Sequence, residues 1–199
     1  MTTATFPIPK PKTKVRPTTM SVERFERHSG LKGYELVEGR LERKGMGALS
    51  SSFNVLMGLL LSTHVRANQL GFTFDSECMY RCFPGKPHTI RKPDVSFVRN
   101  GRFPNNAIPK GIIEIAPDFV IEVMSVHDRW TRVNKKVQEF LDAGVQLVWV
   151  VDPQSLSVHV YVPNGSSTRH LAGDELSADP VVRGFRVQVS ELFPSAAAN

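Results

Sequence analysis

The sequence predicts an α/β (α+β) fold in which helices flank a central mixed β-sheet. An apolar run at 119–124 leads into an amphipathic stretch at 131–143, and a second apolar run follows at 145–151. Two buried strands joined by a helix form a parallel, right-handed crossover. Segments 34–37 and 40–43 flank a Glu38-Gly39 turn, which predicts an antiparallel hairpin. Parallel and antiparallel pairs together make the sheet mixed.

Local patterns predict the remaining elements in chain order. Ser21 is an N-cap candidate for a short helix ending near His28, with Gly30 beyond its end. Phe53, Leu56 and Leu60 recur at helical spacing, which predicts a long helix before Gly71. The expected ranges are helices at 21–28 and 49–70, strands at 72–82, 94–98 and 157–162, a loop at 99–117, an edge hairpin, and a last segment at 187–193.

Length and charge favour one domain behind a basic leader. The 199 residues, of which 41% are hydrophobic, suit a single domain at 19–199. Residues 1–18 are rich in proline and threonine and lack a hydrophobic period, so we expect a disordered leader. Its four basic residues account for most of the net charge of +6, and removing them leaves +2. Overall charge is therefore weak evidence for a nucleic-acid partner.

The sequence argues against a membrane protein and against a zinc or disulfide framework. No uninterrupted apolar run approaches the roughly 20 residues of a membrane span. The N-terminus lacks the features of a signal peptide, so we expect a cytoplasmic protein. Cys78 and Cys82 are the two cysteines. They are too few for a disulfide framework or a four-ligand zinc site, and we expect two reduced thiols.

Glu122 is the unusual residue of the 119–124 run. A strand this apolar is usually covered on both faces, and an unpaired carboxylate there costs several kcal/mol. A cation, a metal ion or protonation must compensate it. A pairing with a core arginine, or a place near the exposed end of the sheet, would explain Glu122 equally well.

Asp94 begins a second strand directly after Pro93. If the two strands are neighbours, the carboxylates of Asp94 and Glu122 converge at one sheet edge. Two hard oxygen ligands suit Mg²⁺ or Mn²⁺, and such an ion can activate water. The alternative interpretation of Asp94 is a cap at the start of the strand.

The predicted helix at 131–143 offers a cation. Lys136 flanks the apolar stripe, three residues after Val133 and four before Phe140, whereas Lys135 points away from it. Lys136 can therefore lie over the sheet, although a snorkelling surface lysine is the usual alternative. Arg129, Arg132 and Lys135 could contact a phosphate backbone or simply be solvated.

Several segments, in this order and spacing, resemble the Uma-two family over about residues 20 to 194. The segments are Tyr34-Glu35-Leu36-Val37-Glu38-Gly39, Arg91-Lys92-Pro93-Asp94-Val95-Ser96-Phe97-Val98, Ile121-Glu122-Val123-Met124-Ser125, Lys136 to Val145, and Trp149-Val150-Val151-Asp152-Pro153. The family is described as restriction endonucleases of the PD-(D/E)xK nuclease superfamily. The resemblance implies a restriction-endonuclease-like core, a central mixed sheet flanked by helices.

The resemblance also implies a function and a site. Pro93-Asp94 would be the "PD" element and Glu122 the acidic member of "(D/E)xK", with Met124 at the lysine position and Lys136 replacing that lysine from the next helix. Asp94, Glu122 and the carbonyl of Val123 would bind Mg²⁺ or Mn²⁺. Glu38 and Glu77 are candidates for an additional carboxylate. The implied activity is that of a metal-dependent DNA endonuclease acting as a homodimer.

The chain departs from the family pattern at two places. Ser50 to Ser52 stand where many relatives have a histidine, and Ser125-Val126-His127 replaces a favoured Ser-Pro-Ser. Both departures concern substrate contacts rather than the three core residues. Two alternatives remain open. One is a catalytically inactive nucleic-acid- or protein-binding module on the same fold. The other is a structural partner that uses the basic leader as its contact.

Overall fold

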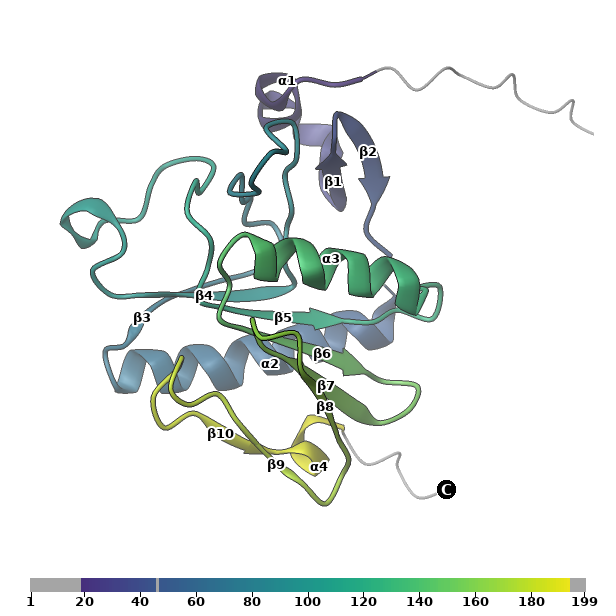
Figure 1. Cartoon of the computed structure of the whole chain (residues 1–199), viewed down its shortest axis with the longest axis vertical. Coiled ribbons are helices and arrows are strands. Elements are labelled where there is room, and N and C mark those ends of the chain that lie inside the picture. Colours follow the sequence, from purple (N-terminus) through teal and green to yellow (C-terminus); the bar gives the residue numbers. More distant parts are fainter. Residues whose placement is uncertain (1–18, 46, 194–199) are drawn as a thin grey trace, which may run out of the picture.

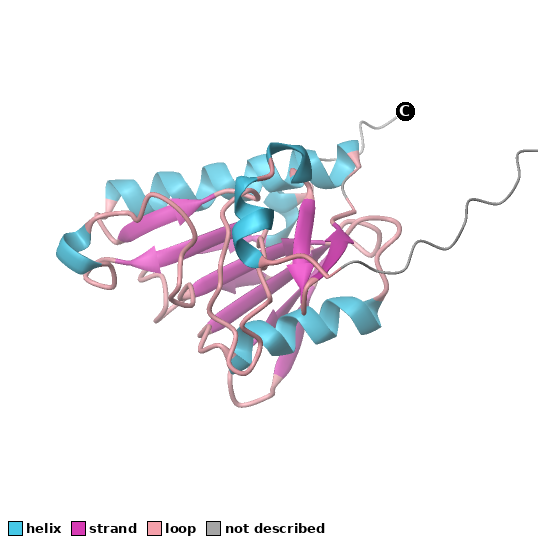
Figure 2. Ribbon diagram, turned by 90° about the horizontal axis from the view of Figure 1, so that it is seen from above, coloured by secondary structure: helices cyan, strands magenta, loops and turns pink. Residues whose placement is uncertain are grey.

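The computed structural model describes residues 19–45 and 47–193, so the predicted leader at 1–18 lies outside the described residues. A six-stranded sheet is covered by helix α2 (Ala48–Ala67) on one face and helix α3 (Trp130–Asp142) on the other (Figures 1 and 2). Its order is β3-β4-β5-β6-β7-β8. Strands β5 and β6 pair in parallel and the other neighbours are antiparallel, which confirms the mixed sheet. The strands are Gly71–Phe74, Val95–Arg99, Phe119–Val123, Leu147–Asp152, Ser157–Tyr161 and Ser167–His170.

Alternation along β5 assigns its side chains to two core layers. Phe119, Ile121 and Val123 pack in the cluster that contains the buried face of α2. Val120 and Met124 pack in the cluster that contains α3. Since successive side chains of a strand point to opposite faces, Glu122 belongs to the α3 face. This face is where the candidate site lies.

The two long helices, α3 and α2, each bury an apolar face against the sheet. In α3 the stripe of Val133, Val137 and Phe140 packs on the sheet, and Gly144 follows the helix with φ +101°. Helix α2 ends at Ala67, three residues before the predicted end. By length and composition alone it could cross a membrane, although Ser52, Asn54 and Ser62 interrupt its apolar runs, as the sequence indicated. However, four of its side chains are buried in the domain core: Phe53, Met57, Leu61 and Val65.

An N-terminal layer lies above α3 and contains α1 (Val22–Arg27), the short 3-10 helix η1 (Ser29–Leu31), β1 (Tyr34–Val37) and β2 (Arg40–Arg43) (Figure 1). The predicted N-cap at Ser21 is confirmed, because its hydroxyl accepts from the Arg24 amide. Glu38 and Gly39 both have positive φ, as a two-residue hairpin turn requires. Leu36 exchanges two backbone hydrogen bonds with Ile90, which fixes the hairpin to the segment preceding β4.

The strand predicted at 72–82 is wrong beyond Phe74. The Asp75 carboxylate accepts a hydrogen bond from the Glu77 amide, and this polar turn ends the strand. Tyr80 then bridges to Arg91 and Ile113. The predicted loop at 99–117 contains the 3-10 helix η2 (Pro104–Asn106). At the end of the chain, β9 (Glu175–Ser177) and β10 (Arg186–Gln188) form a separate hairpin, followed by α4 (Val189–Leu192).

Candidate active site

Asp94, which immediately precedes β4, lies across from Glu122 on the neighbouring strand β5. Val95 pairs with Ile121 in the antiparallel register of β4 and β5. Continuing this register by one residue places Asp94 opposite Glu122. Residues opposite one another in an antiparallel pair point to the same face. The beginning of β4 and the end of β5 thus bring both carboxylates to one place on the α3 face, as the sequence predicted.

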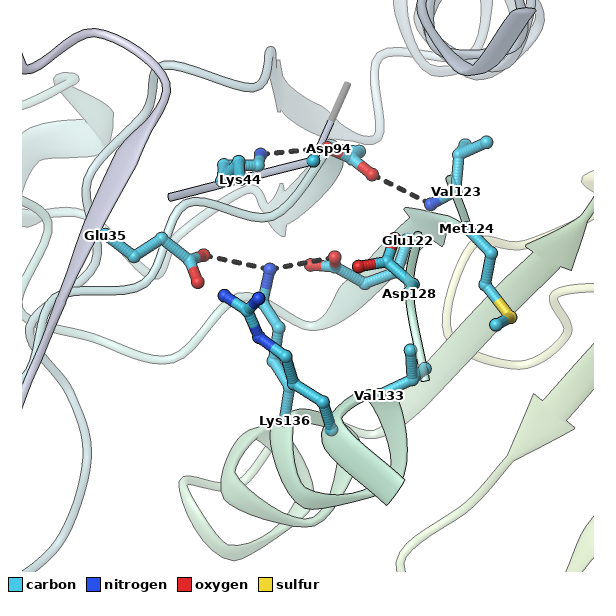
Figure 3. A pocket seen from close by; sticks show the side chains of 11 residues that line it. Glu35, Lys44, Asp94, Glu122, Val123, Met124, Asp128, Val133 and Lys136 are labelled. Carbon is cyan, nitrogen blue, oxygen red and sulfur yellow. Dashed lines mark hydrogen bonds and ion pairs between the residues drawn. The ribbon is translucent and has the colours of Figure 1, made fainter. Parts of the chain in front are cut away.

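Lys136 reaches this place from α3. Its Nζ lies 2.8 Å from Glu122 Oε2 and 2.8 Å from Glu35 Oε1, so one ammonium group joins two carboxylates (Figure 3). The Lys136 side chain is 13% exposed, and its Nζ lies 5.8 Å from the centroid of the Phe140 ring. Lys136 is therefore a largely buried cation of the pocket, and Lys135 is exposed as predicted.

Sequence reasoning missed several members of the pocket, among them the charged residues Glu35 and Lys44. Glu35 on β1 is buried, and Arg91 Nη1 lies 2.9 Å from its Oε2. Lys44, just after β2, lies 2.8 Å from Asp94 Oδ1. Glu35 carries the signal that singled out Glu122, a carboxylate within an apolar run. Lys44 has no such signal, because it follows two other charged residues.

The two predicted candidates for an additional carboxylate do not line the pocket. Glu38 is exposed at the hairpin turn. Glu77 forms an ion pair with Lys92 at 2.8 Å, and its side chain is 44% exposed. The hairpin instead contributes Glu35, three residues before Glu38.

The pocket moves the pKa values of its two glutamates in opposite directions. Burial raises the pKa of Glu122 to about 7, helped by the Asp94 and Glu35 carboxylates and opposed by Lys136. Burial also acts to raise the pKa of Glu35, but Lys136, Arg91 and Lys44 outweigh it and lower that pKa to about 2. The difference has a simple cause. Glu35 lies between two cations, whereas Glu122 shares one cation and faces a second carboxylate.

The donor set fits a divalent cation. Glu122 Oε1 is buried and has no hydrogen-bond partner among the described residues, although buried carboxylate oxygens are normally satisfied. The residues the structure describes contain no cluster of three or more acidic, histidine or cysteine side chains suited to a metal ion. Two carboxylates suffice for Mg²⁺, because it retains several waters. The Val123 amide donates to Asp94 Oδ2 at 2.8 Å and fixes that carboxylate beside Glu122.

The family model that matches residues 22–190 is Uma2, described as "Putative restriction endonuclease". The chain belongs to the Uma2 family. One similar solved structure is described as a putative nuclease belonging to DUF820 from Anabaena variabilis ATCC 29413. It aligns with a TM-score of 0.73 and 23% identity, over 87% of this chain and 97% of that chain. The likeness confirms the predicted nuclease-like fold. A search of curated proteins gave no match.

The basic residues singled out from the sequence lie around the start of α3 in this Uma2 chain. Arg129 is the N-cap residue and is exposed. Arg132 lines the pocket and donates to Glu42 Oε2 at 3.2 Å. Lys135 is exposed and shares a neighbouring hollow with Arg132 and Arg43. We call Arg129, Arg132 and Lys135 the basic rim; of these, Arg132 lines the acidic pocket itself.

Proposed function

We propose that the chain is a metal-dependent DNA endonuclease that hydrolyses phosphodiester bonds. The proposal depends on one observation: Asp94, directly before β4, and Glu122 on β5 line one pocket, with an unpartnered buried oxygen on Glu122 and a buried ammonium beside it. Asp94, Glu122 and the Val123 carbonyl would hold Mg²⁺ or Mn²⁺. The ion would supply Lewis-acid stabilisation of the phosphate and activation of water.

Lys136 acts as a fixed positive charge in this scheme. Burial acts to lower its pKa, but Glu122, Glu35 and Asp94 outweigh burial and raise it, so the side chain stays protonated. A protonated lysine cannot accept a proton from water, but it can orient water and stabilise negative charge that develops on phosphate oxygens. Glu35 positions Lys136 by holding its Nζ at 2.8 Å.

DNA is the partner that the basic rim suits. Arg132 lines a pocket whose own carboxylates would repel an unaccompanied phosphate, Lys135 lines the hollow beside it, and Arg129 lies three residues before Arg132 at the start of α3. Contacts from the rim to flanking phosphates would offset that repulsion and orient the strand. Contacts to phosphates carry no sequence information, so this contribution to binding should be independent of base sequence and weaken with salt.

Plasmid nicking in the presence of Mg²⁺ tests the proposal. Glu122→Gln keeps the size of the side chain but removes a charged ligand, and we expect about 10³-fold slower nicking, since metal catalysis contributes several kcal/mol. Glu38→Gln is the matched control, because the same change is made at an exposed turn. Chelation with EDTA is expected to stop the reaction. Equal nicking by the wild type and Glu122→Gln would refute the assignment.

A catalytically inactive binding module is the second candidate, favoured by the ion pairs already present. Lys136 and Lys44 each lie 2.8 Å from a pocket carboxylate, so the fold has internal cations available to neutralise the site. Under this alternative, Mg²⁺ and Mn²⁺ would leave the melting temperature unchanged. An ion that binds the native state raises it.

We also propose that the protein is a homodimer and that α2 provides the contact. Leu49, Val55 and Leu59 are 54%, 70% and 60% exposed on this helix. No charged residue occurs from Ala48 to Thr63. A two-fold contact sets a surface against itself, so an uncharged surface avoids like-charge repulsion and suits a second copy.

Light scattering tests the dimer. We expect Leu59→Glu to convert dimer to monomer, because the same carboxylate would be introduced on both sides of the two-fold contact. Ile108→Glu makes the same change at a residue that is 52% exposed in a loop, and should leave the mass unchanged. A wild-type protein that is monomeric at high concentration would contradict the proposal.

A further inference from the structure

Lys44 occupies the side of Asp94 that faces the pocket. It follows β2, and its Nζ donates to the Lys92 carbonyl at 2.7 Å and lies 2.8 Å from Asp94 Oδ1. The other oxygen of Asp94 accepts from the Val123 amide at 2.8 Å. The two side chains are 7% and 6% exposed. Both carboxylate oxygens of Asp94 are therefore engaged within the protein.

A divalent ion and the Lys44 ammonium would compete for this carboxylate. Carboxylate oxygens can accept more than one partner, but two cations placed against one buried oxygen repel each other strongly. Resting on the proposed function, we propose that Lys44 is a positioning residue that holds Asp94 in the metal-free protein and must leave it when a divalent ion binds. Lys44 then sets the affinity of the site for the ion.

The surroundings of Lys44 hold its backbone in place and offer its side chain a second carboxylate in the same pocket. The Lys44 amide donates to the Gly33 carbonyl. A Cβ at Gly45 would lie only 2.6 Å from Ser125 Oγ, so the backbone passes close to the segment that follows β5. Asp128 also lines the pocket, with its Oδ1 on the side of Gly45. A released Lys44 ammonium could therefore pair with the Asp128 carboxylate, which lines the same pocket.

A titration with Mn²⁺, which reads ion binding from the paramagnetic resonance of free Mn²⁺, tests the competition without measuring cleavage. We expect Lys44→Met to bind Mn²⁺ about tenfold more tightly than the wild type, because no ammonium must be displaced. Lys135→Met removes the same charge from an exposed position outside the pocket lining and should change the affinity less than about threefold. Lys44→Gln serves as a second variant, because an amide can still donate to the Lys92 carbonyl.

Amine labelling of the wild-type protein tests whether the binding of Mn²⁺ releases Lys44 from Asp94. Without Mn²⁺, Lys44 should react slowly with an acylating reagent, as a 7% exposed side chain does. At saturating Mn²⁺ its labelling, read by mass spectrometry, should rise severalfold while that of Lys135 stays constant.

The possible results separate this inference from the proposed function. Wild-type Mn²⁺ binding that neither Lys44 variant alters, with Lys44 still protected, overturns the inference and leaves the proposed metal site standing. Binding by the Lys44 variants but not by the wild type supports the inference. Absence of Mn²⁺ binding in every variant overturns both.

Discussion

Replacing Lys136 by methionine is expected to slow DNA cleavage by about 10²–10⁴-fold without weakening the binding of a divalent ion, because a positioned charge of this kind acts mainly on the transition state. Methionine retains an apolar stem beside Phe140 but lacks the ammonium that lies 2.8 Å from Glu122 and Glu35. Losing that positive charge makes the pocket more attractive to a cation, so ion affinity should hold or rise.

Initial rates of plasmid nicking and a Mn²⁺ titration on the same preparations separate the two effects. Lys135→Met is the control, since Lys135 is adjacent in sequence, exposed, and carries the same charge. It should lose only the modest contribution of one phosphate contact, and that loss should shrink at high salt. If both variants slow cleavage equally, Lys136 contributes through general electrostatics and has no specific role in the chemistry.

Local sequence patterns sufficed for the part of the site built on β5 and α3. An acidic residue within an apolar run identified Glu122, and alternation along the strand determines the face on which it lies. The spacing of Val133, Lys136 and Phe140 predicted that the lysine would reach the sheet, and its Nζ does reach Glu122. These inferences hold because each depends on the period of one element.

The position of the hairpin beside the site could not be predicted in this way. Its position depends on the backbone pairing between Leu36 and Ile90, two segments far apart in the chain. That pairing carries Glu35 and Lys44 into the pocket and leaves Glu38 exposed at the turn. Similarly, the strand predicted through Cys82 stops at Phe74, because an Asp75 side chain competes for the backbone.

Arg91 holds the hairpin and α3 together, and Arg91→Met is expected to lower the free energy of unfolding by about 3–5 kcal/mol, the usual cost of breaking a buried ion pair from one side. The guanidinium group lies 2.9 Å from Glu35 and 2.5 Å from Glu139, and its side chain is 4% exposed. Removing it leaves two buried carboxylates with fewer partners. Urea denaturation measures the change, with Arg186→Met as the exposed ion-pair control for which we expect little effect.

The cost of Arg91→Met should depend on pH in a definite direction. The folded protein lowers the pKa of Glu35 from 4.5 to about 2, with burial opposed by Lys136 and Arg91. A lowered folded-state pKa stabilises the protein fully above pH 4.5, and this stabilisation is lost as the pH falls toward 2. Arg91→Met lacks one of the cations that lower the pKa of Glu35, so the variant has less of this stabilisation to lose at low pH. The difference in unfolding free energy between wild type and Arg91→Met should therefore be largest near neutral pH and shrink below pH 4.5. A difference that stays constant from neutral pH to pH 3, about midway through that window, would mean that Arg91 stabilises the fold by packing rather than through the Glu35 carboxylate.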